Sequence, residues 1–147
     1  MTTTAKPIAI CNDHAGYDTK QAVIAYLESE GLTYTDYGTY TTDSCDYPDF
    51  AHPCAQAVED GISEIGIAIC GSGNGIAMTL NKHQGIRAAL CWDTELALMA
   101  RAHNNANILV MPGRYISNEK AIEILKTYLS TPFEGGRHQA RIDKIAL

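Results

Sequence analysis

Short apolar runs alternate along the chain with segments in which apolar residues recur every three or four positions. Runs of this length, bounded by glycine, proline or polar residues, are typical of strands. The run at 65–70 is apolar throughout, which is typical of a parallel strand buried on both faces. These runs predict five strands, at residues 7–11, 33–37, 65–70, 87–91 and 108–111.

The intervening segments predict helices. Val23, Ile24 and Leu27 share one helical face, and Gly31 ends that stretch. Comparable patterns follow at 51–61, 76–82, 93–103 and 117–129. Strands that alternate with helices favour right-handed βαβ units. We therefore predict an α/β fold, a Rossmann-like three-layer sandwich with a central, mostly parallel five-stranded sheet.

Composition excludes several classes of protein. Hydrophobic residues make up 46% of the 147 residues, which is enough for a buried core and too many for a disordered chain. The net charge of −6 argues against a nucleic-acid partner. No apolar run approaches the roughly 20 residues that cross a membrane. No repeat or linker interrupts the pattern, so residues 1–147 are expected to form a single domain.

The chain has five cysteines, an odd number with no C-x-x-C pair, and residues 1–6 lack the apolar core of a signal peptide. A secreted disulfide framework does not fit these features. A reduced, cytoplasmic protein is expected instead. Four thiols are predicted to serve as small buried apolar groups, namely Cys11, Cys45, Cys54 and Cys91.

Reactive side chains follow several of the predicted strands. Asp13 and His14 follow the first strand, Cys70 ends the third, and Arg114 follows the fifth. In an open parallel sheet, ligands bind outside the carboxyl ends of the strands. These groups are therefore expected to converge on one edge of the sheet.

A glycine-rich turn, Gly71-Ser72-Gly73-Asn74-Gly75, directly follows Cys70. Without Cβ atoms, such a turn can direct backbone N–H groups at an anion. Its spacing matches neither G-x-G-x-x-G nor a Walker loop, and a tight structural turn is the alternative. Donors of this kind could favour the thiolate of Cys70, for which the alternative is a core cysteine.

Two histidines allow more than one interpretation. His14 could bind an anion, act as an acid or base, or cap a turn. His103 lies at the predicted end of a helix, where a histidine is often only a favourable charge. No H-x-x-H, H-E-x-x-H or Cys/His cluster has metal-ligand spacing, so neither a metal nor another cofactor is expected.

Residues 131–147 form a tail that is locally basic in an acidic chain, with Gly135-Gly136 as a hinge. Arg137 and Arg141 are four residues apart, so a helix would place both guanidinium groups on one face. Such a pair can clamp a phosphate through charge-assisted hydrogen bonds. A solvated or salt-bridged surface is the alternative interpretation.

The chain resembles the type B ribose-5-phosphate isomerases and the related galactose-6-phosphate isomerase subunits. The resemblance extends from about Ile8 to Ile145, and its specificity comes from the ordered set of motifs. These motifs are NDHAG at 12–16, DYPD at 46–49, CGSGNG at 70–75, NK at 81–82, GIRAA at 85–89, RAHN at 101–104, GR at 113–114 and FEGGRHQ at 133–139.

This resemblance implies a metal-free aldose–ketose isomerase that acts on a phosphorylated sugar through an enediol. Cys70 would be the base that moves a proton between the first two sugar carbons. Ser72 and the N–H groups of residues 71–75 would stabilise the oxyanion. His103 would assist ring opening, with Asn104 beside it.

The resemblance also implies which residues hold the substrate. Asp13 and Tyr47 would contact the sugar, and the phosphate would be held by His14, Arg114, Arg137 and Arg141. In this family the site lies between two subunits, and the partner supplies His103 and the C-terminal arginines. A homodimer with shared sites is implied, or a tetramer of such dimers, with the arm at 131–147 reaching the partner subunit.

Two positions depart from the family pattern. Members that lack the cysteine use a glutamate just after the glycine loop, where this chain has Ile76. Asn12 stands where serine or cysteine is more usual.

The pentose-phosphate enzyme is favoured because one chain carries both the cysteine and the arginines, whereas galactose-6-phosphate isomerase divides its site residues between two different subunits. The resemblance therefore implies the reaction of the pentose-phosphate enzyme, the interconversion of ribose 5-phosphate and ribulose 5-phosphate. The alternatives are an isomerase of a six-carbon sugar phosphate, such as allose or galactose 6-phosphate, a non-catalytic sugar-phosphate-binding protein, and a redox sensor based on Cys70.

Overall fold

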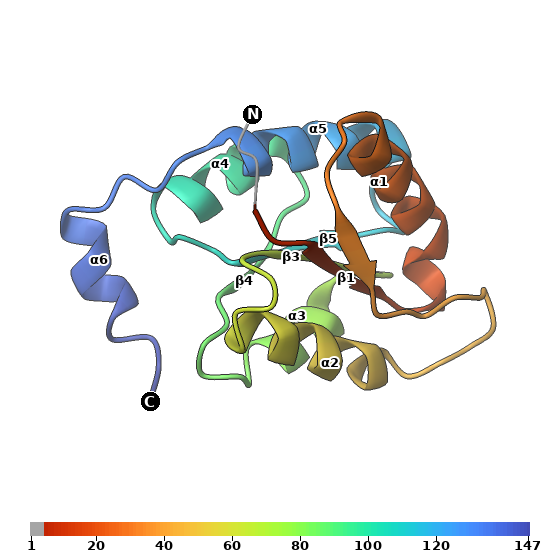
Figure 1. Ribbon diagram of the computed structural model, residues 1–147, viewed down its shortest axis with the longest axis horizontal. Helices are drawn as coiled ribbons and strands as arrows, with labels where there is room; N and C mark the ends of the chain where they lie inside the picture. The colour runs from red at the N-terminus through yellow and green to blue at the C-terminus, as the bar shows by residue number, and fades with distance from the viewer. Residues whose placement is uncertain (1–4) are drawn as a thin grey trace.

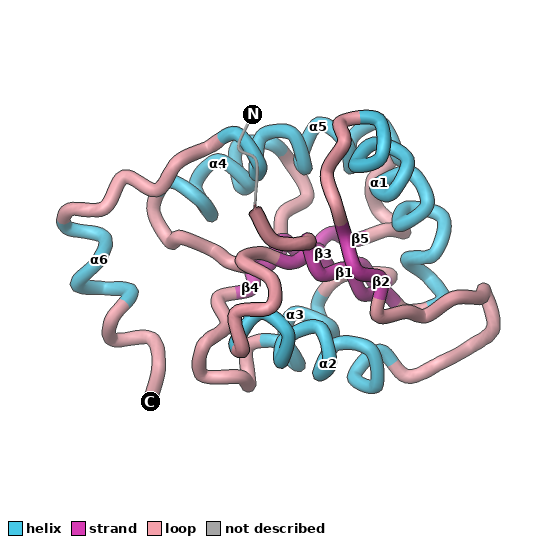
Figure 2. The backbone as a smooth tube through the Cα atoms, in the orientation of Figure 1, coloured by secondary structure: helices cyan, strands magenta, loops and turns pink. Residues whose placement is uncertain are grey.

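A computed structural model describes residues 5–147 and has three layers, with helices on both faces of one sheet (Figure 1, Figure 2). The strand order is β2-β1-β3-β5-β4, and every strand pair within residues 5–147 is parallel. The predicted α/β fold and its five strands are confirmed, and the sheet is wholly rather than mostly parallel. The strands are β1 (Ile8–Asn12), β2 (Tyr34–Asp36), β3 (Gly66–Cys70), β4 (Ala88–Leu90) and β5 (Ile108–Pro112).

The helices are divided between the two faces of the sheet (Figure 1). One face is covered by α1 (Tyr17–Ser29), α4 (Thr94–Ala102) and α5 (Asn118–Ser130). The other face is covered by α2 (Tyr47–Glu59) and α3 (Asn74–Leu80). A short 3-10 helix, η1 (His14–Gly16), precedes α1, and α6 (Arg137–Ile142) stands apart near the C-terminus. None of the helices between residues 5 and 147 is both long and apolar enough to cross a bilayer.

The hydrophobicity of each strand matches its place in the sheet. All residues of β1, β3 and β5 are buried, whereas those of the edge strands β2 and β4 are only partly buried. A strand covered by helices on both faces must be apolar at successive positions. The apolar run predicted at 65–70 therefore lies at the centre of the sheet.

Two helices begin earlier than their apolar pattern predicts. The expected helix at 51–61 starts at Tyr47, because Asp46 adopts the extended conformation of a cap and Pro48 is tolerated in a first turn. The helix expected from residue 76 starts at Asn74, inside the glycine loop. Both predicted starts were wrong because the first turns contain Pro48 and Gly75, residue types that are read from sequence as turns rather than as helix.

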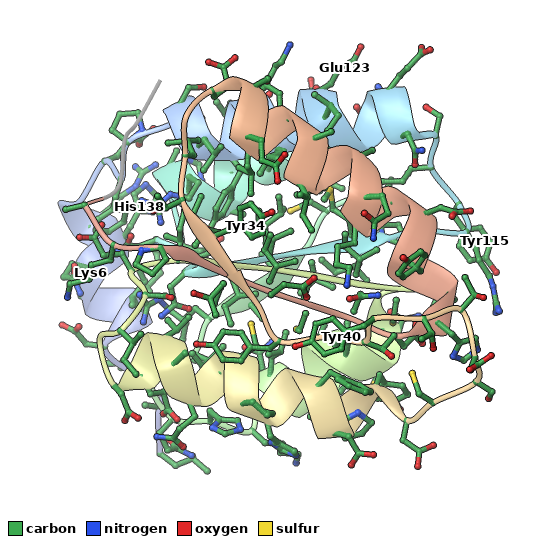
Figure 3. All side chains as sticks on the ribbon, turned by 45° about the vertical axis from the view of Figure 1, so that its right-hand side comes forward. Lys6, Tyr34, Tyr40, Tyr115, Glu123 and His138 are labelled. Atoms are coloured by element: carbon green, nitrogen blue, oxygen red, sulfur yellow. The ribbon has the colours of Figure 1, made fainter. Side chains whose placement is uncertain are left out.

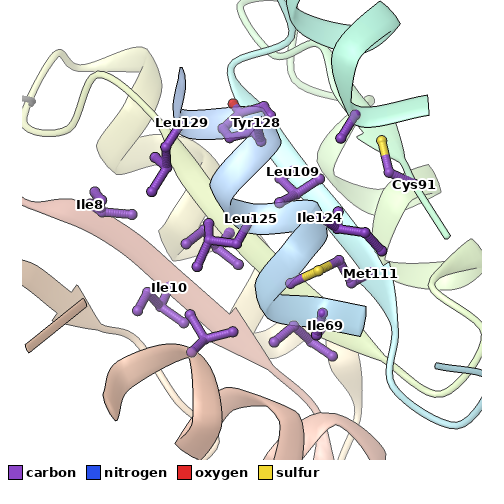
Figure 4. Packing of buried hydrophobic residues seen from close by; sticks show 14 of the residues in the cluster. Ile8, Ile10, Ile69, Cys91, Leu109, Met111, Ile124, Leu125, Tyr128 and Leu129 are labelled. Carbon is purple, nitrogen blue, oxygen red and sulfur yellow. The ribbon is translucent and has the colours of Figure 1, made fainter. Parts of the chain in front are cut away.

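The core has two parts, one on each face of the sheet. On the first face, α5 packs on the three central strands, as Figure 4 shows, and its Tyr128 hydroxyl donates to the Ala106 carbonyl at 2.8 Å. The second part lies under α2 and α3 and includes Cys11, Cys54 and Cys70. Cys91 is buried on the first face, so three of the four cysteines predicted to be core residues are confirmed.

Candidate active site

Three loops meet at the carboxyl edge of the sheet because hydrogen bonds continue beyond the strand ends. The Asp13 N–H donates to the Ile69 carbonyl at 3.2 Å, which joins the loop after β1 to β3. Gly113 and Arg114 donate to the carbonyls of Cys70 and Gly71 at 2.8 and 3.0 Å. The predicted convergence of these loops is confirmed. It occurs at the β1/β3 switch point, where ligands bind in open α/β sheets.

The glycine loop allows neighbouring elements to approach closely. Gly73 has φ +79°, and a Cβ there would lie 2.4 Å from the Leu90 Cδ1 atom. A Cβ on Gly75 would lie 2.4 Å from the Tyr47 ring, at Cζ. The Arg114 side chain comes within 3.3 Å of the Cβ position of Gly71. Because Gly71 and Gly75 carry no side chains, Arg114 and Tyr47 can lie directly against the backbone of the loop.

Cys70 is 4% exposed and lies under this loop. Burial raises the pKa of its thiol, and the nearby Asp13 carboxylate raises it further. The N–H groups of Ile76, Gly73 and Ser72 act in the opposite direction and lower the pKa, but burial outweighs them. The expected donors are present and act in the predicted direction, but burial keeps the pKa of the Cys70 thiol above its ordinary value.

The two positions that depart from the family pattern are both buried. The Ile76 side chain is fully enclosed in the core under α2 and α3, so this position offers no second base. The Asn12 amide donates to the Asp13 carbonyl at 2.9 Å. Within residues 5–147, Asn12 Oδ1 has no hydrogen-bond partner.

Hollows flank the glycine loop. One is lined by Asp13, His14, Cys45 and the 46–49 segment. In it, Asp13 Oδ1 accepts from the N–H groups of Ala15 and Gly16 at 2.9 and 3.1 Å, which fixes the carboxylate. The other hollow is lined by Ser72, Asn74, Leu90, Trp92, Pro112 and Tyr115.

Cys45 is the exception among the cysteines predicted to be core residues. It is only partly buried, because it lies in the loop between β2 and α2 rather than on a strand or helix face. Its Sγ atom is 3.9 Å from His14 Nδ1. The prediction of a core role for Cys45 was therefore wrong, and the thiol lines the first hollow.

The remaining predicted site residues lie at the opposite edge of the sheet. The helix α4 begins beyond the carboxyl end of β4 and runs antiparallel to the strands. His103 and Asn104, at its end, therefore lie near the amino ends of the strands. There, the Gly66 N–H at the start of β3 donates to the Asn107 carbonyl at 2.8 Å. The Glu134 N–H donates to the Ala102 carbonyl at 3.0 Å, which places the arm at this edge as well.

The arm contains a short helix, α6, that carries Arg137 and Arg141, and both side chains are exposed. In Figure 3, His138 of this arm lies on the side of the molecule opposite Tyr115, which follows β5. Cys70, Ser72, Asp13 and Tyr47 therefore form one group within the chain. A second group consists of His103, Asn104, Arg137 and Arg141.

Sequence reasoning missed one cluster at the amino edge. His103 and His138 stack with ring centroids 4.2 Å apart, and Glu134 Oε1 lies 3.7 and 3.5 Å from their respective Nε2 atoms. His103 directly follows α4, Glu134 lies in the arm between α5 and α6, and His138 lies in α6. Glu134 and His138 are four residues apart, but nothing in the sequence links this pair to His103, which it meets only where the arm returns to the end of α4.

Known proteins share this architecture along nearly the whole chain. The profile of a family described as Ribose/Galactose Isomerase matches residues 8–145. This chain belongs to that family. The ribose-5-phosphate isomerase B of Escherichia coli (strain K12) is 39% identical over 140 residues, which cover 95% of this chain and 94% of that protein. A probable ribose-5-phosphate isomerase B of Mycoplasma pneumoniae is 42% identical, with 95% and 92% covered.

Solved structures agree with this assignment. A ribose 5-phosphate isomerase from Thermotoga maritima has a TM-score of 0.95 at 48% identity, covering 97% of this chain and 99% of its own. A ribose-5-phosphate isomerase B from Mycoplasma genitalium with bound ribulose-5-phosphate has a TM-score of 0.92 at 39% identity, covering 97% and 95%. Membership in the family makes this chain an isomerase.

The contact between Gly75 and Tyr47 can be tested by a double-mutant cycle. We expect Gly75→Ala to lower the free energy of unfolding by about 1–3 kcal/mol, because the added methyl overlaps the Tyr47 ring. In a Tyr47→Ala background the same substitution should cost much less. Urea unfolding of the four proteins measures both values. Equal costs in the two backgrounds would show that the ring does not restrict this position.

Proposed function

We propose that this protein interconverts ribose 5-phosphate and ribulose 5-phosphate through an enediolate, with Cys70 as the base. The observation that carries the proposal is the Cys70 thiol lying beneath the N–H groups of the glycine loop, at the edge where parallel sheets bind ligands. The names of the relatives and the ribulose-5-phosphate bound to one structural neighbour support a five-carbon substrate.

The proposed reaction is a proton transfer within the open-chain sugar. The Cys70 thiolate removes the proton from C2 of the aldose, and the electron pair moves to form an enediolate. The thiol then returns the proton to C1, while the hydroxyl proton moves from the oxygen on C2 to the oxygen on C1. Ser72 and the loop N–H groups stabilise the oxyanion, and the mechanism invokes no metal.

The hollow beside the loop supplies further contacts in this proposal. The Asp13 carboxylate, already held by two N–H groups, and the Tyr47 hydroxyl would contact the sugar hydroxyls. His14 and Arg114 would contact the phosphate from the loops after β1 and β5. Gly71, Gly73, Asn74 and Gly75 would provide the backbone surface beneath the substrate.

We further propose that a second copy of the chain completes each site. His103 and Asn104 would assist ring opening, and Arg137 and Arg141 would hold the phosphate, all from the partner of a homodimer. In support, these residues lie at the edge opposite Cys70, and the two arginines make no ion pair within residues 5–147. Trp92 and Tyr115, 56% and 76% exposed, border the hollow at Ser72, where a partner would pack.

We also propose the extent of the isomerase domain and the cellular compartment of the protein. Residues 1–147 would form one isomerase domain, with the segment at 131–147 acting as an arm that reaches the partner. All five cysteines are free thiols, in agreement with the reduced, cytoplasmic setting that we propose.

Replacing the base tests the mechanism. We expect Cys70→Ala to lower kcat with ribose 5-phosphate by about 10²–10⁴-fold, because the group that moves the proton is removed. Binding of the sugar phosphate should persist, since the loop and the phosphate ligands remain. A coupled assay and calorimetric binding measure the two effects. Cys91→Ala, which removes a buried thiol elsewhere, is the matched control and should retain turnover.

Two measurements separate this function from its alternatives. Exchange of the C2 proton with solvent should occur in the wild-type protein and be lost in Cys70→Ala, whereas a binding protein would show no exchange. With a chelator present, kcat/KM should be higher for ribose 5-phosphate than for allose 6-phosphate. Full turnover by Cys70→Ala would show that the proposed base is wrong.

The raised pKa of Cys70 predicts a pH dependence. Only the thiolate can take the proton, so kcat/KM should rise as the pH increases from about 7 to 9. The substrate phosphate, whose second pKa is near 6, stays dianionic over this range and does not contribute. Initial rates at low substrate concentration give the profile. A kcat/KM that falls across this interval would contradict a thiol base with a raised pKa.

A further inference from the structure

The geometry points to a binding site for a divalent transition-metal ion, such as Zn²⁺, formed by His103, Glu134 and His138. We propose that the bound ion inhibits the isomerase, because it occupies the imidazole of His103. The inhibitory part rests on the proposed function. The binding part rests only on the arrangement of the three side chains.

Their separations match those of ligands around one ion. Glu134 Oε1 lies 3.7 Å from His103 Nε2 and 3.5 Å from His138 Nε2. Ligand atoms at roughly 2.0–2.2 Å from a tetrahedral Zn²⁺ stand about 3.4 Å from one another. One ligand atom from each of the three residues lies within 4.8 Å of the other two. Small side-chain movements therefore bring all three to bonding distance.

The same distances are too long for good hydrogen bonds. An N–H···O hydrogen bond has its atoms about 2.9 Å apart, so Glu134 is not firmly hydrogen-bonded to either ring. A second group of similar side chains, Glu59, His83 and His52, lies on the α2 side of the molecule and has shorter separations. There, Glu59 Oε1 and His83 Nδ1 are 2.8 Å apart, and His83 Nε2 and His52 Nδ1 are 2.7 Å apart. The ring nitrogens and the carboxylate of that group are already paired by hydrogen bonds, whereas those of the His103 cluster remain available to bind an ion.

The exposure of the three side chains also suits an incoming ion. The side chains of His103 and Glu134 are 36% and 58% exposed, and that of His138 is 12% exposed. The two rings are nearly parallel, with 16° between their planes, so binding requires them to tilt until their lone pairs converge. His103 follows the end of α4 and is the more exposed of the two rings, so we expect it to tilt. The hydrogen bond from the Glu134 N–H to the Ala102 carbonyl keeps the carboxylate nearby.

The ligand types favour a particular class of ion. Two imidazoles and one carboxylate suit Zn²⁺, Co²⁺ or Ni²⁺, whereas Mg²⁺ and Ca²⁺ prefer oxygen ligands. Water would complete the coordination shell, as in other open sites with three protein ligands. Binding would tie α6, with its two arginines, to the end of α4 and would remove the free imidazole of His103 from catalysis.

Calorimetric titration of the full-length protein with Zn²⁺ alone tests the site. We expect one ion per chain for the wild type and at least about tenfold weaker binding for Glu134→Gln and His138→Ala. Glu134→Gln keeps the shape of an exposed side chain, so it tests the site without a large change in packing. His52→Ala is the matched control and should bind as the wild type does. Unchanged affinity in both Glu134→Gln and His138→Ala would overturn the site.

Turnover in the presence of Zn²⁺ tests the inhibitory part. Inhibition should follow the same titration, be reversed by a chelator, and require about tenfold more Zn²⁺ in Glu134→Gln. Equal inhibition of this variant would place the effect at another group, such as the thiol of Cys70 or Cys45, and overturn the proposal. Zinc binding by a protein without isomerase activity would instead refute the proposed function and leave the metal site supported.

Discussion

The parallel pairing of β1, β3 and β5 is the constraint on which the site depends. These three strands are buried on both faces, and their hydrogen bonds continue into the loops beyond them. As a result, Asp13, Cys70 and Arg114 leave neighbouring strands at the same edge. The missing side chains of the glycine loop then let Tyr47 and Arg114 approach the backbone around the thiol.

The same topology separates the candidate residues. In right-handed βαβ units a helix runs antiparallel to its strands, so residues at a helix end lie at the edge opposite residues at a strand end. His103 and the arm therefore cannot belong to the edge of Cys70. The separation explains why we propose that two chains share each site. It also leaves His103, Glu134 and His138 gathered as a cluster of their own.

Apolar patterning was sufficient to predict the sheet and most helices, because burial on both faces requires continuous apolar strands such as 65–70. The rule for strand ends likewise predicted the group around Cys70. Three features could not be predicted from the sequence, because each depends on the three-dimensional arrangement of the chain. The pKa of Cys70 depends on the balance between burial and N–H donors, the exposure of Cys45 depends on the path of its loop, and the cluster at Glu134 depends on where the arm returns.

Mixing two inactive variants tests the central claim, that each site is completed by a second chain, most directly. Cys70→Ala and His103→Ala damage different edges of the same chain. After the two are unfolded together and refolded, half of the dimers should be mixed and carry one intact site, giving about a quarter of the wild-type activity. Activity no higher than that of the two variants measured separately would contradict a site shared between chains.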